Sequence, residues 1–219
     1  MISRRPLLIG ALTTLAAPSL QAQGPDRMTR IDFEAAATGS LPAGITPMLT
    51  GSSGPVAWMV VEDPTAPAGP KVLAQTSKDK ADYRFPLAVF DQPVLQDVDV
   101  AVRFKPVAGE VDRAAGIAIR LTDRNNYYVV RANALEDNVR LYKVTNGDRR
   151  QFAGVSAKVP SGKWQELRLK VQGSRFEVFF EGKSLYTADD TAIVGGGRVA
   201  LWTKSDSVTH FDDLRIQAH

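Results

Sequence analysis

Two acidic residues at alternate positions, Glu110 and Asp112, form the first pattern in the sequence that could do chemistry. On one face of a strand this spacing brings two carboxylates close together, and a retaining glycosidase needs its pair about 5–5.5 Å apart. The pattern stops there, because Arg113, Ala114 and Ala115 follow and supply no third carboxylate. The segment also has the character of a turn. We therefore expect both side chains to lie in a solvated loop rather than to form a catalytic pair.

Other catalytic constellations have little support. The chain has no cysteine, which excludes disulfides, zinc–thiolate sites and a cysteine nucleophile. Its two histidines are His210 and His219, and no Gly-x-Ser-x-Gly elbow occurs, so a serine triad is not indicated. The fold must be held together by its hydrophobic core.

A set of arginine, asparagine and tyrosine residues is the better candidate for a site. If Ile117, Ile119, Val139 and Leu141 face the core, strand alternation directs this set to the outer face of the same sheet. Aromatic rings stack on sugar rings, and Arg and Asn bind hydroxyl groups, so such a face could bind carbohydrate. The alternative is a solvated face with ordinary cross-strand pairs. The predicted ligand-binding residues are Arg120, Tyr127, Arg131, Asn133, Arg140 and Tyr142.

Three tryptophans could add stacking surfaces to such a site. Trp58 and Trp202 are candidates, although a core position is the commoner role for each. Trp164 follows a Gly-Lys turn, and we expect it to be structural.

The segments that must position these residues follow a two-residue period from Val98 onward. Apolar and polar side chains alternate in short runs, which is typical of strands with one buried face. Turn residues at 123–126, 146–148, 161–163 and 181–183 should make most neighbouring strands antiparallel partners. The expected strands are Val98–Phe104, Ile117–Leu121, Tyr127–Asn133, Val139–Val144, Leu167–Val171, Phe176–Phe180, Arg198–Thr203 and Phe211–Ile216.

The segment from Leu41 to Pro70 has a different composition. It is rich in Gly and Pro, and only Val56–Val61 has strand character, so we expect long loops there. These could be binding loops or a structural wrap over a sheet edge. The length suits one all-β domain, and residues 23–219 are expected to form a single antiparallel β-sandwich.

Several motifs add a family resemblance. Gly162-Lys163-Trp164, Leu167–Val171 and Arg175–Leu185 resemble the laminin G-like and concanavalin A-like pattern, which implies a jelly-roll sandwich. Ala115–Arg120 and Asn126–Arg131 are similar to the 3-keto-disaccharide hydrolase domain family and its relatives. The resemblance covers roughly Val98 to Ile216, with Ile31–Glu34 as a fitting first strand. The same sandwich hosts lectins, hydrolases and adhesion modules, so the resemblance implies the fold more than the function.

The resemblance also implies a place for a metal. First and last strands of jelly rolls lie side by side, and carbohydrate-binding relatives often bind calcium there through oxygen ligands. Asp32, Glu34, Asp212 and Asp213 fit such a site and predict structural calcium. The alternative is that these carboxylates pair with Arg30 or Arg215.

The first 22 residues have the features of a signal peptide. Arg4 and Arg5 precede an apolar run from Leu7 to Leu20, and cleavage after Ala22 or near Ser19 is expected. Ser3–Leu8 resembles the twin-arginine motif, with an ordinary basic leader as the alternative. The run is shorter than the roughly 20 residues that span a bilayer, so we expect no membrane span and a periplasmic or secreted protein.

The charge balance bears on partners. Two of the 27 basic residues are Arg4 and Arg5, so the remainder nearly balances the 24 acidic residues. Without a block of like charge, nucleic-acid binding has no electrostatic basis.

These features together predict an exported protein that binds a carbohydrate or glycan. A first alternative is a glycoside hydrolase or lyase acting on a modified disaccharide. It would need an acidic residue beside Arg120 and Arg131, and Glu136 and Asp137 are the nearby candidates. A second alternative is a structural or protein-interaction domain of laminin G type, which would present a flat apolar patch.

Overall fold

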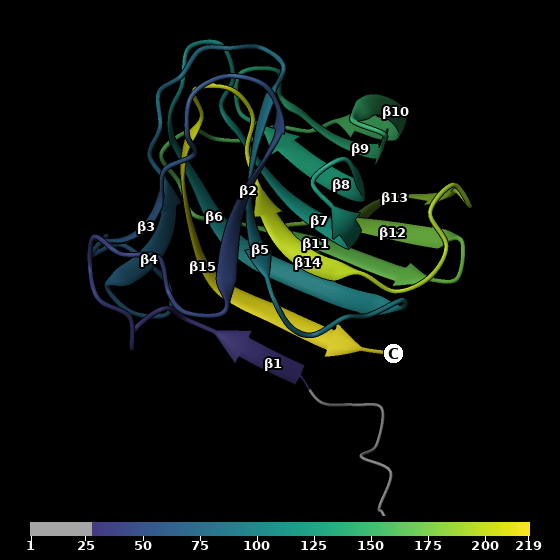
Figure 1. Ribbon diagram of the computed structural model, residues 1–219, viewed down its shortest axis with the longest axis horizontal. Helices are drawn as coiled ribbons and strands as arrows, with labels where there is room; N and C mark the ends of the chain where they lie inside the picture. The colour runs from purple at the N-terminus through teal and green to yellow at the C-terminus, as the bar shows by residue number, and fades with distance from the viewer. Residues whose placement is uncertain (1–27) are drawn as a thin grey trace, which may run out of the picture.

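The computed structural model describes residues 28–219, which form fifteen strands in two stacked antiparallel sheets (Figure 1). No helix occurs in this part of the chain. The prediction of an all-β antiparallel sandwich is confirmed. The predicted signal peptide lies outside the described residues.

Sheet A contains the first and last strands, β1 (Met28–Ile31) and β15 (Val208–Ala218), which pair as expected; Met28 is opposite Gln217 and Ile31 is opposite Leu214. The predicted bounds of the first strand, Ile31–Glu34, are wrong, because β1 ends at Ile31. Figure 1 shows β1 beside β15, near the C-terminus. The order across sheet A is β13 (Lys183–Asp189), β12 (Arg175–Phe180), β11 (Gln165–Gln172), β6 (Val98–Ala108), β15 (Val208–Ala218), β4 (Lys71–Gln75) and β3 (Trp58–Glu62), with β1 (Met28–Ile31) added on β15.

Sheet B is built largely from consecutive hairpins, and β14 inserts between β7 and β5. Its order is β10 (Asp148–Ser156), β9 (Asn138–Thr145), β8 (Asn126–Asn133), β7 (Ala114–Asp123), β14 (Arg198–Trp202), β5 (Arg84–Phe90) and β2 (Ile45–Gly51).

The main core lies between the sheets and follows the predicted alternation. On β11, Leu167, Leu169 and Val171 are buried, while the side chains between them are directed to the outer face of sheet A. Ile117 on β7 and Leu141 on β9 meet them from sheet B. Each such side chain stabilises the fold by about 1.5–3 kcal/mol.

Five strands were not expected from the sequence: β2, β4, β5, β10 and β13. β2, β10 and β13 lie at sheet edges, where side chains are partly exposed and the apolar alternation is weak. β4 and β5 lie inside the sheets, and their short, largely buried runs show no alternation. β2 even contains Pro47, a residue that sheets tolerate at their edges. The segment predicted to be long loops therefore supplies one strand to each sheet, β2 and β3.

Sheet B is strongly curved, and its outer face is concave. The Arg149 guanidinium on β10 lies 4.6 Å from the ring centroid of Phe85 on β5. These strands are five steps apart in the sheet, which in a flat sheet would separate them by roughly 24 Å. The curvature brings the two ends of the sheet together across its outer face.

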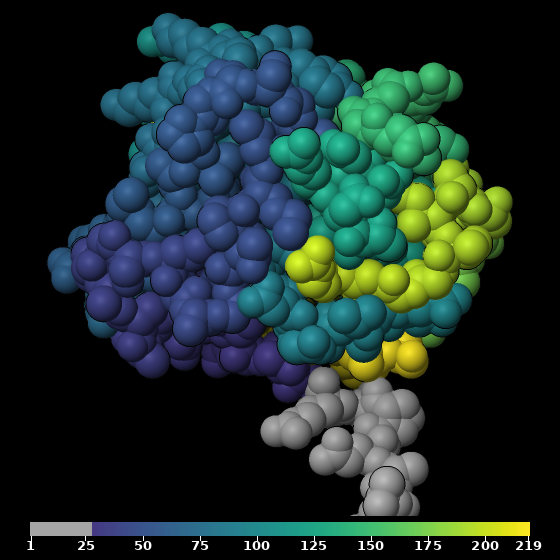
Figure 2. Space-filling model, in the orientation of Figure 1, coloured from purple at the N-terminus to yellow at the C-terminus, as the bar shows by residue number. Residues whose placement is uncertain are grey.

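Two hydrogen bonds tie this curved sheet across its concave side. The Tyr83 hydroxyl donates to the carbonyl of Gly147 in the turn after β9, and the Thr50 hydroxyl on β2 donates to the carbonyl of Arg124. Figure 2 shows the corresponding surfaces meeting, blue for the residues around 50 and green for the turn after β7. The concave face consequently encloses a second apolar cluster, of which Leu87, Val89, Val129 and Val144 are fully buried members.

Candidate functional site

Aromatic rings form the floor of the concave face of sheet B. Trp202 on β14 stacks on Phe85, with ring centroids 5.4 Å apart and an interplanar angle of 22°. The Trp202 indole N–H donates to the Tyr127 hydroxyl at 3.3 Å, and this hydroxyl also lies 2.9 Å from that of Thr50. Burial raises the pKa of Tyr127 to about 12, so it stays a neutral hydrogen-bonding group. The floor is therefore rigid and hydrogen-bonded at its polar points.

Gly116 on β7 makes room for this floor. It is opposite Trp202 on one side and Arg131 on the other. A Cβ atom at this position would lie 2.8 Å from the Val130 carbonyl oxygen and 3.1 Å from the Trp202 ring. The lack of a side chain thus lets the indole lie flat across the centre of the concave face.

Arg149 covers the rings. Its guanidinium carbon lies 4.4 Å from the ring centroid of Tyr142, 4.6 Å from Phe85 and 5.8 Å from Trp202. A cation at these distances is attracted to each ring face. The Nη1 atom of Arg149 is buried and has no hydrogen-bond partner among the described residues.

Arg131 is the second cation on the concave face, and only 2 % of its surface is exposed. Its Nη2 donates to Glu136 at 2.8 Å and to the Asn138 side chain at 2.7 Å. Its guanidinium carbon is 5.5 Å from the ring centroid of Tyr142, so Arg131 and Arg149 share this ring. The Nε atom of Arg131 is also buried without a partner in residues 28–219.

Asp112 is a buried carboxylate at one end of the concave face, where it contacts Asn133 and Lys204. Its Oδ1 accepts from the Asn133 side chain at 2.9 Å, and its Oδ2 lies 3.1 Å from the Lys204 ammonium. Burial raises the pKa of Asp112, against the opposing charges of Arg131 and Lys204. The expectation of a solvated loop is wrong for Asp112, which is 1 % exposed, and fits the exposed Glu110, which pairs with Lys80.

Five of the six predicted ligand-binding residues lie on the concave face, as alternation indicated. Their expected exposure is wrong for four of them, because curvature encloses the face: Tyr127, Arg131, Asn133 and Tyr142 are buried. Arg140 is half-exposed and contacts Gln151 and Glu136.

Arg120 is the exception, since the structure directs it to the opposite side of sheet B. A β-bulge interrupts the pairing of β7 with β8 after Ile119, and Arg120 adopts a φ of 48°. Its guanidinium lies over Phe176 of the main core and donates to the carbonyls of Gln96, Ile193 and Gly173 at 2.6–3.1 Å. A bulge shifts the side-chain period by one residue, which explains why alternation failed here.

The predicted calcium ligands are not gathered into a metal centre. Within residues 28–219, no group of three or more His, Cys, Asp or Glu side chains could hold a metal ion. Asp212 accepts backbone N–H groups of Ala68 and Asp213, and Glu34 accepts that of Lys71. Asp32 caps the backbone of Glu34, and Asp213 pairs with Arg30 at 2.5 Å. The competing interpretation, pairing with Arg30 or Arg215, holds for Asp213, whereas Asp32, Glu34 and Asp212 accept backbone N–H groups instead.

The remaining candidates are structural. Trp58 is buried against Phe211 in the main core, and the Trp164 indole N–H donates to Thr65 beside a turn. His210 lies 2.8 Å from Asp63 on sheet A, away from the concave face. Asp137 pairs with Lys158 and accepts from the backbone of Val159, whereas Glu136 contacts Arg131.

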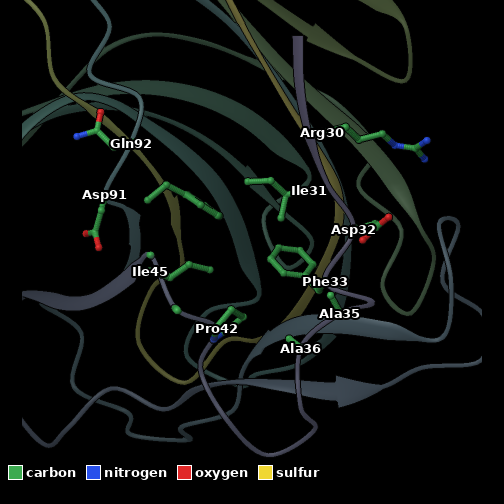
Figure 3. Close-up of a pocket in the computed structure, with 13 residues that line it drawn as sticks. Arg30, Ile31, Asp32, Phe33, Ala35, Ala36, Pro42, Ile45, Asp91 and Gln92 are labelled. Carbon is green, nitrogen blue, oxygen red and sulfur yellow. The ribbon is translucent and has the colours of Figure 1, made fainter.

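A mainly apolar cavity lies elsewhere, at the end of the sandwich beside β1. It encloses about 450 Å³ and is lined mainly by apolar side chains such as Phe33, Ile45 and Phe90. Figure 3 shows Arg30 and Gln92 at its opposite margins rather than within it. This lining offers few of the convergent polar groups that orient a sugar.

Sequence reasoning missed Arg149, Lys204 and Phe85 as members of the site. Arg149 lies on an edge strand that was not predicted, and Phe85 and Lys204 come from segments that sheet curvature and the crossover of β14 bring together. Their aromatic or basic side chains were the only feature of the sequence that could have marked these three as candidate site residues.

An antiparallel two-sheet jelly roll whose concave face carries arginines above aromatic rings defines a concanavalin- and galectin-like sandwich. Residues 88–219 match the family model described as "Galactocerebrosidase, C-terminal lectin domain". The match covers more than half of the chain, which therefore belongs to the galactocerebrosidase C-terminal lectin domain family. The similarity to 3-keto-disaccharide hydrolase domains stays a resemblance.

Solved structures share the fold at low sequence identity. Cellulose induced protein Cip1 is 12 % identical with a TM-score of 0.64, and 87 % of this chain covers 97 % of that one. The carbohydrate-binding module CBM66 of Bacillus subtilis is 16 % identical with a TM-score of 0.60, covering 78 % and 95 % of the two chains. The β-glucanase of Bacillus licheniformis is 11 % identical with a TM-score of 0.57, covering 91 % and 100 %. No curated protein sequence matches the chain significantly.

Proposed function

We propose that this protein binds a carbohydrate or glycan at the concave face of sheet B. The observation that carries the proposal is the pair of buried guanidinium atoms, Arg131 Nε and Arg149 Nη1, that have no partner among residues 28–219. A buried donor without an acceptor costs about 1–3 kcal/mol, and an acceptor group on a ligand would remove that cost. Beside them lie the buried rings of Tyr142, Phe85 and Trp202, which hold the Arg149 guanidinium in place.

Family membership and the shared fold support this proposal. The matched family is named for a lectin domain, and CBM66 is titled a carbohydrate-binding module. Domain 4 of the arabinanase AbnA from Geobacillus stearothermophilus, with a TM-score of 0.56 and 14 % identity, was solved in complex with arabinotriose. Residues 28–219 contain no helix that could span a membrane.

A glycan array followed by calorimetric titration of the best binder tests the proposal. We expect Arg131→Lys, which keeps the charge but removes the Nε donor and the planar fork, to weaken binding roughly tenfold or more. Lys170→Ala is the matched control, because Lys170 lies on the outer face of sheet A, between the buried Leu169 and Val171. It should leave the affinity unchanged.

Two results would contradict the proposal. Unchanged affinity in a folded Arg131→Lys protein would exclude the concave face as the site. Absence of binding to any glycan would remove the function itself and favour the protein-interaction alternative of laminin G type.

Hydrolysis or elimination is a second candidate function, supported by two carboxyl groups beside Arg131. Burial raises the pKa of Asp112. Partial burial acts the same way on Glu136, but hydrogen bonds from Asn138 and Arg131 outweigh it and lower its pKa. Divergent values are what an acid–base pair requires. A turnover assay on every glycan that binds separates this function from binding alone.

We also propose that the chain is exported to the periplasm or beyond, with Arg4 and Arg5 as part of a twin-arginine address. Replacing both by lysine should block export, because that machinery recognises the guanidinium pair. The measurement is the distribution of the protein between cytoplasm and periplasm in cells that express each version. Normal export of the double variant would contradict the twin-arginine route and favour the general one.

A further inference from the structure

We infer that the ligand of the concave face is an acidic saccharide, whose carboxylate is bound by the guanidinium of Arg149 with Arg131 beside it. The inference rests on the proposed function and adds the chemical class of the ligand. Arg149 differs from the other cations of the site in its lack of a carboxylate partner within residues 28–219.

Arg149 is the cation of the concave face that lacks a carboxylate. Arg131 contacts Glu136 at 2.8 Å, and Arg140 lies 4.0 Å from the same carboxylate. Lys204 lies 2.6 Å from Asp82 and 3.1 Å from Asp112. Among residues 28–219, no acidic group lies within ion-pair distance of the Arg149 side chain.

The surroundings of Arg149 leave one of its hydrogen-bonding atoms without an acceptor among the described residues. The N–H groups of a guanidinium form a planar fork that suits planar acceptors. In Arg149 the ring contacts involve Tyr142, Phe85 and Trp202, and the buried Nη1 has no acceptor within the described part of the chain. A carboxylate matches such a planar edge with two parallel hydrogen bonds.

The electrostatics of the site favour an anion at the same place. Burial lowers the pKa of Arg149 most, and the positive charge of Arg131 lowers it further, whereas Tyr142 and the negative charge of Asp112 oppose the shift. Both guanidinium groups flank the ring of Tyr142, so an anion bound at one is also attracted by the other. A neutral sugar would offer hydroxyl acceptors but no negative charge.

A set of paired oligosaccharides tests the inference, each pair comprising a uronic-acid oligosaccharide and its carboxyl-reduced, neutral counterpart. We expect the folded protein to prefer the acidic member by tenfold or more, and the preference to weaken as salt is raised. Arg149→Gln should remove most of the preference, measured as the ratio of the affinities for the acidic and neutral members of each pair. Arg150→Gln is the matched control, because Arg150 is the exposed neighbour paired with Asp148.

The outcomes distinguish this inference from the function on which it rests. Equal binding of acidic and neutral members would overturn the inference and leave glycan binding intact, whereas no binding at all would overturn both. Stronger binding of sulfated than of carboxylated sugars would overturn the carboxylate assignment. If Arg149→Gln does not fold, Arg149→Lys keeps the charge without the planar fork, and a full acid preference in that variant would count against bidentate recognition.

Discussion

Replacing Trp202 by alanine should lower the free energy of unfolding by about 3–5 kcal/mol, the range measured for large aromatic residues in cores. Trp202 is fully buried, stacks on Phe85 and donates a hydrogen bond to Tyr127, although it lies on the outer side of sheet B. For a domain of this size the loss corresponds to a decrease in melting temperature on the order of 10 °C. Thermal and denaturant unfolding would measure it.

Trp164→Ala is the control for this experiment. That indole is partly exposed and lies beside a turn, so its removal should cost less than that of Trp202. A Trp202→Ala protein as stable as the wild type would show that the concave face is an open surface instead of a second core.

Arg120→Met should destabilise the fold by several kcal/mol while leaving glycan affinity unchanged. The substitution keeps an unbranched side chain but removes the donors to the carbonyls of Gln96, Ile193 and Gly173. Each carbonyl left without a partner costs about 1–3 kcal/mol. The sequence had predicted a ligand-binding residue on the outer face of the sheet instead.

Arg140→Met provides the comparison for Arg120. Arg140 is half-exposed, and its contact with Glu136 is long, so the change in stability should be at most about 1 kcal/mol. Unfolding curves and glycan titrations on both variants are required. Weaker glycan binding in a stable Arg120→Met protein would restore Arg120 to the binding site and contradict the structure.

Most of the central strands could be predicted from the sequence because apolar alternation marks their buried face, whereas β4 and β5 are buried runs without alternation and were missed. Alternation at Val98–Phe104 or Leu167–Val171 reflects a constraint that burial imposes residue by residue. The edge strands β2, β10 and β13 lack this constraint, and backbone pairing with a neighbour defines them instead. Local composition carries little information about such pairing.

The sequence predicted which face of the sheet the site residues share, but not that this face is buried. The two-residue alternation of apolar and polar side chains correctly placed Arg131, Tyr142 and Tyr127 on one face. The local sequence does not indicate that β5 and β10 approach each other across that face. The bulge at Arg120 was equally invisible, because a left-handed arginine conformation has no sequence marker. Arg149 was missed for both reasons, since it needs the edge strand and the curvature together.

The rings around Arg149 have a consequence for the thermodynamics of recognition. A free arginine side chain loses about 2 kcal/mol of rotamer entropy when it is fixed. In this protein Tyr142, Phe85 and Trp202 already restrict the guanidinium, so much of that loss occurs during folding. Binding to a preorganised donor then sacrifices less motion, and a small ligand with few contacts can be held more tightly.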